Sequence, residues 1–197
     1  MGKRMRRLSA AVRGVGSPVY TGNRGMGFEI AIEHSNRVYE HLGLALVNKR
    51  PTPMKIQSKT AGGRITGDLE KPSTVDFDGT LPGGRSIYFE AKQCKLPDRF
   101  PLDKLEQHQY DYLEKAHRFG SIGFLLIEFT VHRTVYLLPF KTLERYWHRW
   151  KAGGGVRGTA SIHKDDMDVY AYIVESGRVP VDYIPVVRKV WGLEDAV

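Results

Sequence analysis

Two β-rich segments joined by a turn constrain most strongly what this chain can fold into. The segments are residues 74–78 and 85–92, and the run GTLPGG between them is rich in turn-forming residues. Two such segments separated by a short loop that contains Gly and Pro favour an antiparallel hairpin. We therefore predict a β-hairpin here and a sheet that extends from it.

The second segment contains SIYFEAK, and side chains along a strand point alternately to its two faces. Glu90 and Lys92 therefore share one face, while Phe89 and its apolar neighbours two residues away line the other. Asp76 in the first segment supplies a carboxylate across the hairpin. Because hard divalent cations prefer oxygen ligands, we expect Asp76 and Glu90 to converge on Mg²⁺, or on Mn²⁺ in its place.

Such a site suits the hydrolysis of phosphodiesters. A bound metal polarises a phosphoryl oxygen and lowers the pKa of a bound water, and the Lys92 ammonium would stabilise the negative charge that develops. The residues alone leave another interpretation open, in which Glu90 and Lys92 form a solvated strand face and Asp76 belongs to a turn. Asp78 also competes with Asp76, since alternation places both on one face.

The charge balance favours a polyanionic partner. Lys and Arg number 30 against 22 Asp and Glu, a formal net charge of +8, which indicates nucleic acid before an anionic membrane surface. No apolar run approaches the roughly 20 residues that span a bilayer, and the basic N-terminus lacks the apolar segment of a secretory signal. We expect a cytoplasmic protein without a membrane partner. The single cysteine, Cys94, excludes an intrachain disulfide.

Residues 1–22 are predicted to form a flexible basic arm that suits phosphate contacts, with a solubilising tail as the alternative. Residues 23–197 are predicted to form one domain, because no internal repeat or second composition class interrupts them. Residues 51–73 lack sustained periodicity and indicate an excursion from the core. The other expected elements are a helix from residue 23 to Gly43, a strand at 44–47, a helix at 102–116, strands at 123–129 and 134–139, and a helix at 140–150.

Five motifs resemble the RecU family of Holliday-junction resolvases, and their order also matches. They are NRGMGFE at 23–29, KRPTP at 49–53, STVDFDG at 73–79, GRSIYFEAK at 84–92 and HQ at 108–109. The resemblance implies the α/β restriction-endonuclease-like fold, with a central mixed β-sheet flanked by helices and a projecting stalk at about 51–73. It also implies a structure-selective endonuclease that resolves Holliday junctions by metal-dependent phosphodiester hydrolysis, with paired symmetrical nicks, in recombination and DNA repair.

By the same resemblance, the magnesium site comprises Thr74, Asp76, Glu90 and Gln109, with Thr74 acting through its hydroxyl or its backbone carbonyl. Lys92 matches the residue that stabilises the transition state, and Glu29 matches an additional acid directed toward the metal. The basic residues placed at the DNA are Arg24, Lys49, Arg50, Lys55, Lys59 and Arg64. The implied partners are four-way branched DNA, a second copy of the chain in a homodimer, and a RecA-type recombinase as a further candidate.

Two alternatives to a resolvase stay open. The same metal site can serve a phage or restriction-type nuclease with another DNA substrate, because a fold and its metal centre do not fix specificity. The chain can also be a non-catalytic protein that binds branched DNA or modulates a recombinase. The presence of Asp76, Glu90 and Lys92 together argues against lost chemistry.

Overall fold

The computed structural model describes residues 27–51, 53–59, 62–63, 65–69, 74–154 and 156–193. The predicted basic arm at 1–22, and with it Arg24 and Arg64, lies outside the described residues. No helix within the described ranges is long and apolar enough to cross a membrane.

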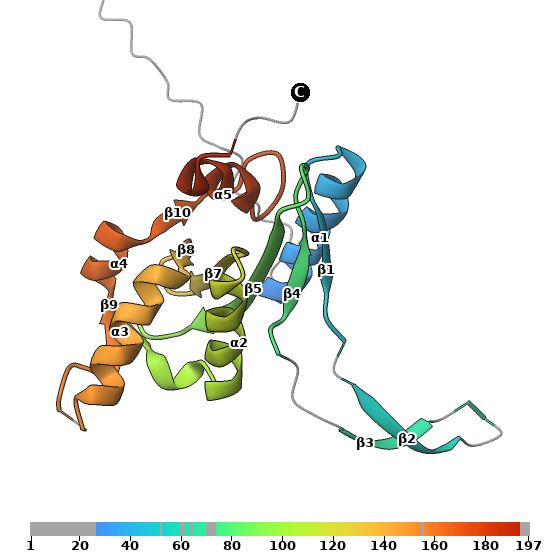
Figure 1. Ribbon diagram of the computed structural model, residues 1–197, viewed down its shortest axis with the longest axis horizontal. Coiled ribbons are helices and arrows are strands. Elements are labelled where there is room, and N and C mark those ends of the chain that lie inside the picture. The colour runs from blue at the N-terminus through green and yellow to red at the C-terminus, as the bar shows by residue number, and fades with distance from the viewer. Residues whose placement is uncertain are drawn as a thin grey trace, which may run out of the picture.

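A mixed β-sheet forms the centre of the molecule (Figure 1). Within the described residues its order is β1 (Leu46–Lys49), β4 (Phe77–Thr80), β5 (Ser86–Cys94), β7 (Ile122–Phe129), β8 (Thr134–Pro139) and β10 (Tyr172–Val174). The β5–β7 pair is parallel and the other neighbours are antiparallel. The predicted hairpin is therefore confirmed, since β4 and β5 pair with Phe77 opposite Phe89.

Helices cover both faces of this sheet, each over its own hydrophobic core (Figure 1). The first core lies under α1 (Phe28–His41) and α5 (Tyr183–Trp191). The second lies under α2 (Gln107–Arg118), α3 (Phe140–Ala152) and α4 (Lys164–Tyr170), and it also includes the 3-10 helix η1 (Leu102–Lys104). This arrangement confirms the predicted fold class, a central mixed sheet flanked by helices.

An aromatic stack fixes the register of the central strands. Phe77, Phe89 and Phe124 lie on adjacent strands, are fully buried, and stack with ring centroids 4.8 Å apart at each step. Such pairs contribute about 0.5–1.5 kcal/mol each beyond their burial. A slip of one residue would turn these rings to the opposite face, so the stack also holds Glu90 on the face opposite Phe89.

The projecting stalk is present as a separate two-stranded sheet, β2 (Met54–Lys59) paired with β3 (Ile65–Leu69). Figure 1 shows this pair extending away from the central sheet, beyond the ends of β1 and β4. Its described side chains are almost all exposed, and neither hydrophobic core includes any of them. The stalk therefore contributes surface rather than core.

Three sequence-based boundaries need correction. The helix expected from residue 23 begins at Phe28, because the Gly27 backbone (φ −58°, ψ 153°) is not helical. The expected helix at 102–116 is interrupted, because Leu105 and Glu106 have extended backbones and separate η1 from α2. The first strand runs over 46–49 rather than 44–47, because Gly43, with φ of +66°, ends the α1 turn and leaves Leu44 beside that turn. A further small sheet, β6 (Arg99–Pro101) with β9 (Ser161–His163), joins the second core.

Candidate metal centre

Asp76 and Glu90 face each other across the β4–β5 hairpin. Asp76 lies one residue before β4, and the register of Phe77 with Phe89 extends to place it opposite Glu90. The Asp76 backbone N–H donates to Glu90 Oε2 at 2.9 Å, and the Ala91 N–H donates to Asp76 Oδ2 at 3.0 Å. Each carboxylate is thus held by the backbone of the opposite segment, and both are brought together as the strand alternation predicted.

The second oxygen of Glu90 meets two further donors. Gln109 Nε2 lies 2.6 Å from Glu90 Oε1, and Lys92 Nζ lies 2.7 Å from the same atom. Glu90 is only 1% exposed, whereas the Lys92 side chain is 20% exposed and so reaches solvent. A buried carboxylate beside a partly exposed ammonium places a positive charge at the rim of the site.

Burial raises the pKa of Glu90 from 4.5 to about 8, because loss of hydration outweighs the attraction of the Lys92 ammonium. The nearby Asp76 carboxylate raises the pKa further through like-charge repulsion. A divalent cation between the two carboxylates would relieve this repulsion and favour ionised Glu90. The donor set, two carboxylates from the two sides of the hairpin, therefore fits a hard cation such as Mg²⁺.

Gln109 is at the site, but its amide is oriented differently from the expectation for a ligand. Its Oε1 accepts the Glu106 N–H at 3.0 Å, and the Glu106 side chain accepts from the Gln109 N–H, so the two residues form a capping box. Its Nε2 faces Glu90. To offer oxygen to a metal, the Gln109 amide must turn over and release the cap.

Thr74 and Arg50 form a second group beside the carboxylates. Arg50 Nη1 donates to Thr74 Oγ1 at 2.7 Å, and the Arg50 backbone N–H donates to the Asp76 carbonyl at 2.8 Å. The Arg50 guanidinium also lies 3.7 Å from Asp78 Oδ2 and over the Tyr112 ring. Arg50 therefore braces the segment that carries Asp76, and the Thr74 hydroxyl is engaged with Arg50.

Glu29 is directed elsewhere in this structure. Its carboxylate pairs with Lys49 Nζ at 2.7 Å, and Lys49 also approaches Glu33 at 3.5 Å. None of the hydrogen bonds or ion pairs of Glu29 within the described ranges reaches Asp76 or Glu90. Lys49 and Arg50 lie where β1 leads into the stalk, and Lys55 and Lys59 are exposed on β2.

A second cluster of possible metal ligands lies between α2 and α3. Glu114 on α2 and Glu144 and His148 on α3 bring their ligand atoms within 4.8 Å of one another. This cluster was not predicted from the sequence, although the four-residue spacing of Glu144 and His148 places them on one helix face. Its contact with α2 depends on how the two helices pack, which spacing does not reveal.

A mixed sheet flanked by helices, with an Asp and an E-x-K sequence meeting across a hairpin of that sheet, defines a nuclease of the restriction-endonuclease-like class. The family model described as recombination protein U matches residues 23–189. This chain belongs to the RecU family, as the sequence motifs predicted.

Two relatives at about a third identity agree with this assignment. The Holliday junction resolvase RecU of Geobacillus sp. (strain WCH70) is 34% identical over 176 residues, covering 86% of this chain and 85% of the relative. That of Staphylococcus aureus (strain JH9) is 35% identical over 179 residues, covering 88% and 84%. Among solved structures, Hjc, a Holliday junction resolvase from Archaeoglobus fulgidus, is 13% identical with a TM-score of 0.36, covering 70% of this chain and 92% of that one.

Proposed function

We propose that this chain is a structure-selective endonuclease that resolves Holliday junctions by Mg²⁺-dependent phosphodiester hydrolysis. The observation that carries the proposal is the meeting of Asp76 and Glu90 across the hairpin with Lys92 at 2.7 Å from Glu90. Relatives that share about a third of this sequence are named Holliday junction resolvases. The paired nicks would act in recombination and DNA repair.

The residues divide the work of hydrolysis. Asp76 and Glu90, with the Thr74 carbonyl and the Gln109 amide beside them, would hold the metal. When bound, Mg²⁺ supplies a polarised phosphoryl oxygen and an activated water. Lys92 reaches the rim of the site and stabilises the negative charge of the pentacoordinate phosphorus. The ion pair with Glu90 fixes the Lys92 ammonium beside the metal ligands. Glu29 stays a candidate for a supporting acid, but it would first have to break its ion pair with Lys49.

The substrate requires two sites in one assembly. Symmetrical resolution cuts two opposed strands, and a twofold homodimer supplies two equivalent centres related by the symmetry of the junction. Lys49, Arg50, Lys55 and Lys59 lie on the stalk or at its base, where they would contact phosphates rather than base edges. A RecA-type recombinase is the further partner that the family resemblance implies.

The test is cleavage of an immobile four-way junction beside a linear duplex, with and without Mg²⁺ or Mn²⁺. We expect metal-dependent paired nicks in the junction. Asp76→Asn should abolish them while leaving the fold intact, and Lys92→Ala should slow single-turnover cleavage by about 10²–10³. Asp103→Asn, the same substitution at an exposed position on η1, is the matched control and should cleave normally.

Two other outcomes would reject the proposal. Junction binding without cleavage under every metal condition would favour a non-catalytic branched-DNA-binding protein. Equal cleavage of junction and linear duplex would keep the nuclease chemistry but replace the resolvase with a nuclease of another DNA substrate.

A further inference from the structure

A basic cavity lies on the same side of the sheet as Glu90 but apart from the metal centre. It has a volume of about 590 Å³ and is formed where β6, β9, the end of α3 and the loop after α3 meet. A cavity of this size holds more than one phosphate group and suits a nucleotide unit. Its basic lining residues are Arg99, Arg149, Arg157 and His163.

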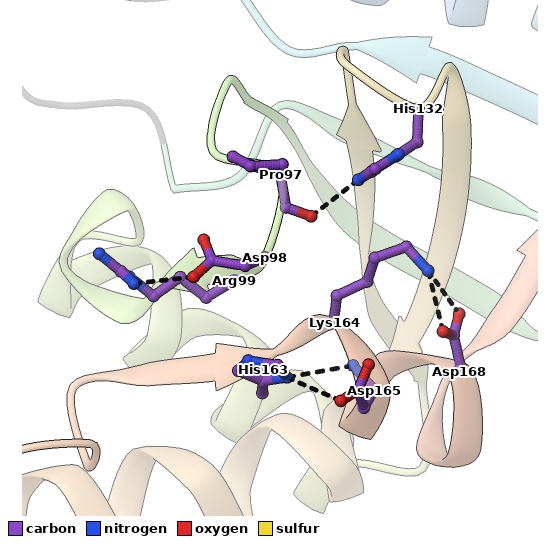
Figure 2. A network of polar contacts seen from close by, with 8 residues as sticks. All are labelled: Pro97, Asp98, Arg99, His132, His163, Lys164, Asp165 and Asp168. Atoms are coloured by element: carbon purple, nitrogen blue, oxygen red, sulfur yellow. Dashed lines mark hydrogen bonds and ion pairs between the residues drawn. The ribbon is translucent and has the colours of Figure 1, made fainter.

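The walls of this cavity are held by the backbone. Arg99 and His163 are register partners of the β6–β9 pair, so their side chains lie on one face. The Lys164 N–H donates to the Asp98 carbonyl at 2.7 Å, and His132 Nε2 lies 2.8 Å from the Pro97 carbonyl. Figure 2 shows the segment before β6 tied in this way to the β7–β8 turn, close to the start of α4. The β6–β9 wall of the cavity is therefore held in place without a ligand.

Two guanidinium groups of the cavity, those of Arg149 and Arg157, are available to bind an anion. Two carboxylates also line it: Asp98 is paired with Arg99 at 2.9 Å, and Asp166 lies beside the Tyr146 hydroxyl. Arg149 lies over the Tyr146 ring, and neither Arg149 nor Arg157 forms an ion pair with any residue in the described ranges. Guanidinium groups without a carboxylate partner in a preformed cavity match the bidentate geometry of phosphate oxygens.

The position of the cavity relates it to a bound DNA. Ile162 and Phe100 beside the cavity belong to the same core as α2, whose first turn carries Gln109 of the metal centre. In Figure 1 the stalk and the end of α3 project on opposite sides of α2, toward the same edge of the molecule. A duplex that enters the metal centre from the stalk would continue toward the cavity.

We propose that this cavity is a second phosphate-binding site, which takes the sugar–phosphate backbone of a DNA arm leaving the metal centre. The proposal rests on the proposed function only in that the ligand is DNA. It adds an anchor on the side of the active site away from the stalk. Because backbone phosphates are present in every sequence, this anchor contributes affinity without sequence preference.

The test is DNA binding by the full chain, measured by fluorescence anisotropy in Ca²⁺ over a series of salt concentrations. Arg149→Gln and Arg157→Gln should each weaken binding of four-way junction and linear duplex roughly tenfold. Each should also lower the slope of log affinity against log salt by about 0.9 for every phosphate that the variant no longer neutralises. Arg85→Gln is the matched control, because Arg85 is exposed on the β4–β5 turn, before the first residue of β5. This variant should bind DNA as the unmodified chain does.

Single-turnover cleavage at saturating protein separates this proposal from the proposed function. The metal centre is intact in both variants, so cleavage at saturation should proceed at the unmodified rate. If the unmodified chain cleaves junctions and both variants keep its affinity and salt slope, the cavity proposal is wrong and the proposed function stands. If the variants lose binding of a free mononucleotide or inorganic phosphate but keep DNA affinity, the site takes a small anion and the DNA assignment is overturned. Should Arg149→Gln not fold, Arg157→Gln, in an exposed loop, decides alone.

Discussion

At the scale of single residues, Glu90 carries most of the electrostatic character of the metal centre. Its side chain is buried and accepts hydrogen bonds from the Asp76 N–H and Gln109, as well as the ion pair from Lys92. These donors favour the ionised form, while burial and Asp76 oppose it and raise the pKa to about 8. The ionised form of Glu90 is therefore unfavourable when no cation is bound. This is expected of a centre whose ligands must be ionised before a metal binds.

This raised pKa predicts how metal affinity depends on pH. Below about pH 8 a metal must displace the proton of Glu90, so apparent Mg²⁺ affinity should rise up to about tenfold per pH unit between about pH 6 and 8 and then level off. Titration calorimetry at several pH values measures this, and a flat profile would contradict it. The Glu90→Gln variant should bind Mg²⁺ more weakly, and its Mg²⁺ affinity should no longer depend on pH in this range.

The same shift has a consequence for stability with a definite sign. The pKa of Glu90 in the folded protein lies above the unfolded value of 4.5. Its contribution to the free energy of unfolding is therefore fully present below pH 4.5. It is lost as the pH rises through about 8. Metal-free protein should therefore become less stable to urea across this range, and saturating Mg²⁺ should reverse the loss at about pH 8.

At the scale of elements, the metal centre depends on strand register and on one helix start. The stack of Phe77, Phe89 and Phe124 on one face of the sheet fixes which residues reach the other face. The α2 capping box fixes where Gln109 enters. Each feature decides whether the carboxylates and the amide meet.

Removing the central ring of this stack should weaken the whole fold. Phe89→Ala leaves a cavity between Phe77 and Phe124, and buried Phe→Ala substitutions cost about 3–5 kcal/mol. Urea denaturation measures the loss. Phe119→Ala is the matched control, because Phe119 is 90% exposed and its truncation should change the free energy of unfolding by less than about 0.5 kcal/mol. Similar effects of the two substitutions would argue against the stack as the element that sets the register.

At the scale of the whole molecule, the core and the stalk have separate tasks. Two hydrophobic cores hold the sheet and its helices, and both exclude the described residues of β2 and β3. The stalk cations Lys55 and Lys59 are exposed, whereas Lys49 and Arg50 at its base lie within ion-pair distance of acidic side chains. Stability thus resides in the sheet and its helices, and the projecting pair is available for DNA.

Replacement of residues 52–73 by a short Gly-Ser linker tests this separation. Thermal unfolding and Mg²⁺ binding should stay close to those of the full chain, because both hydrophobic cores stay whole. Affinity for the four-way junction should fall by roughly tenfold or more, because the shortened chain neutralises fewer phosphates, and preference over linear duplex should fall with it. A collapse of thermal stability would show that the stalk supports the fold.

The sequence by itself determined the hairpin, the shared face of Glu90 and Lys92, and the approach of Asp76, because strand alternation is a local property with a period of two residues. The family motifs added the identity of the fold. Only the tertiary structure decided that Gln109 presents its amide nitrogen to Glu90, that Glu29 pairs with Lys49, and that Arg50 braces the Asp76 segment. It also assembled the basic cavity from β6, β9 and α3. These contacts join residues far apart in the chain, and their geometry follows from how helices and strands pack rather than from any spacing along the sequence.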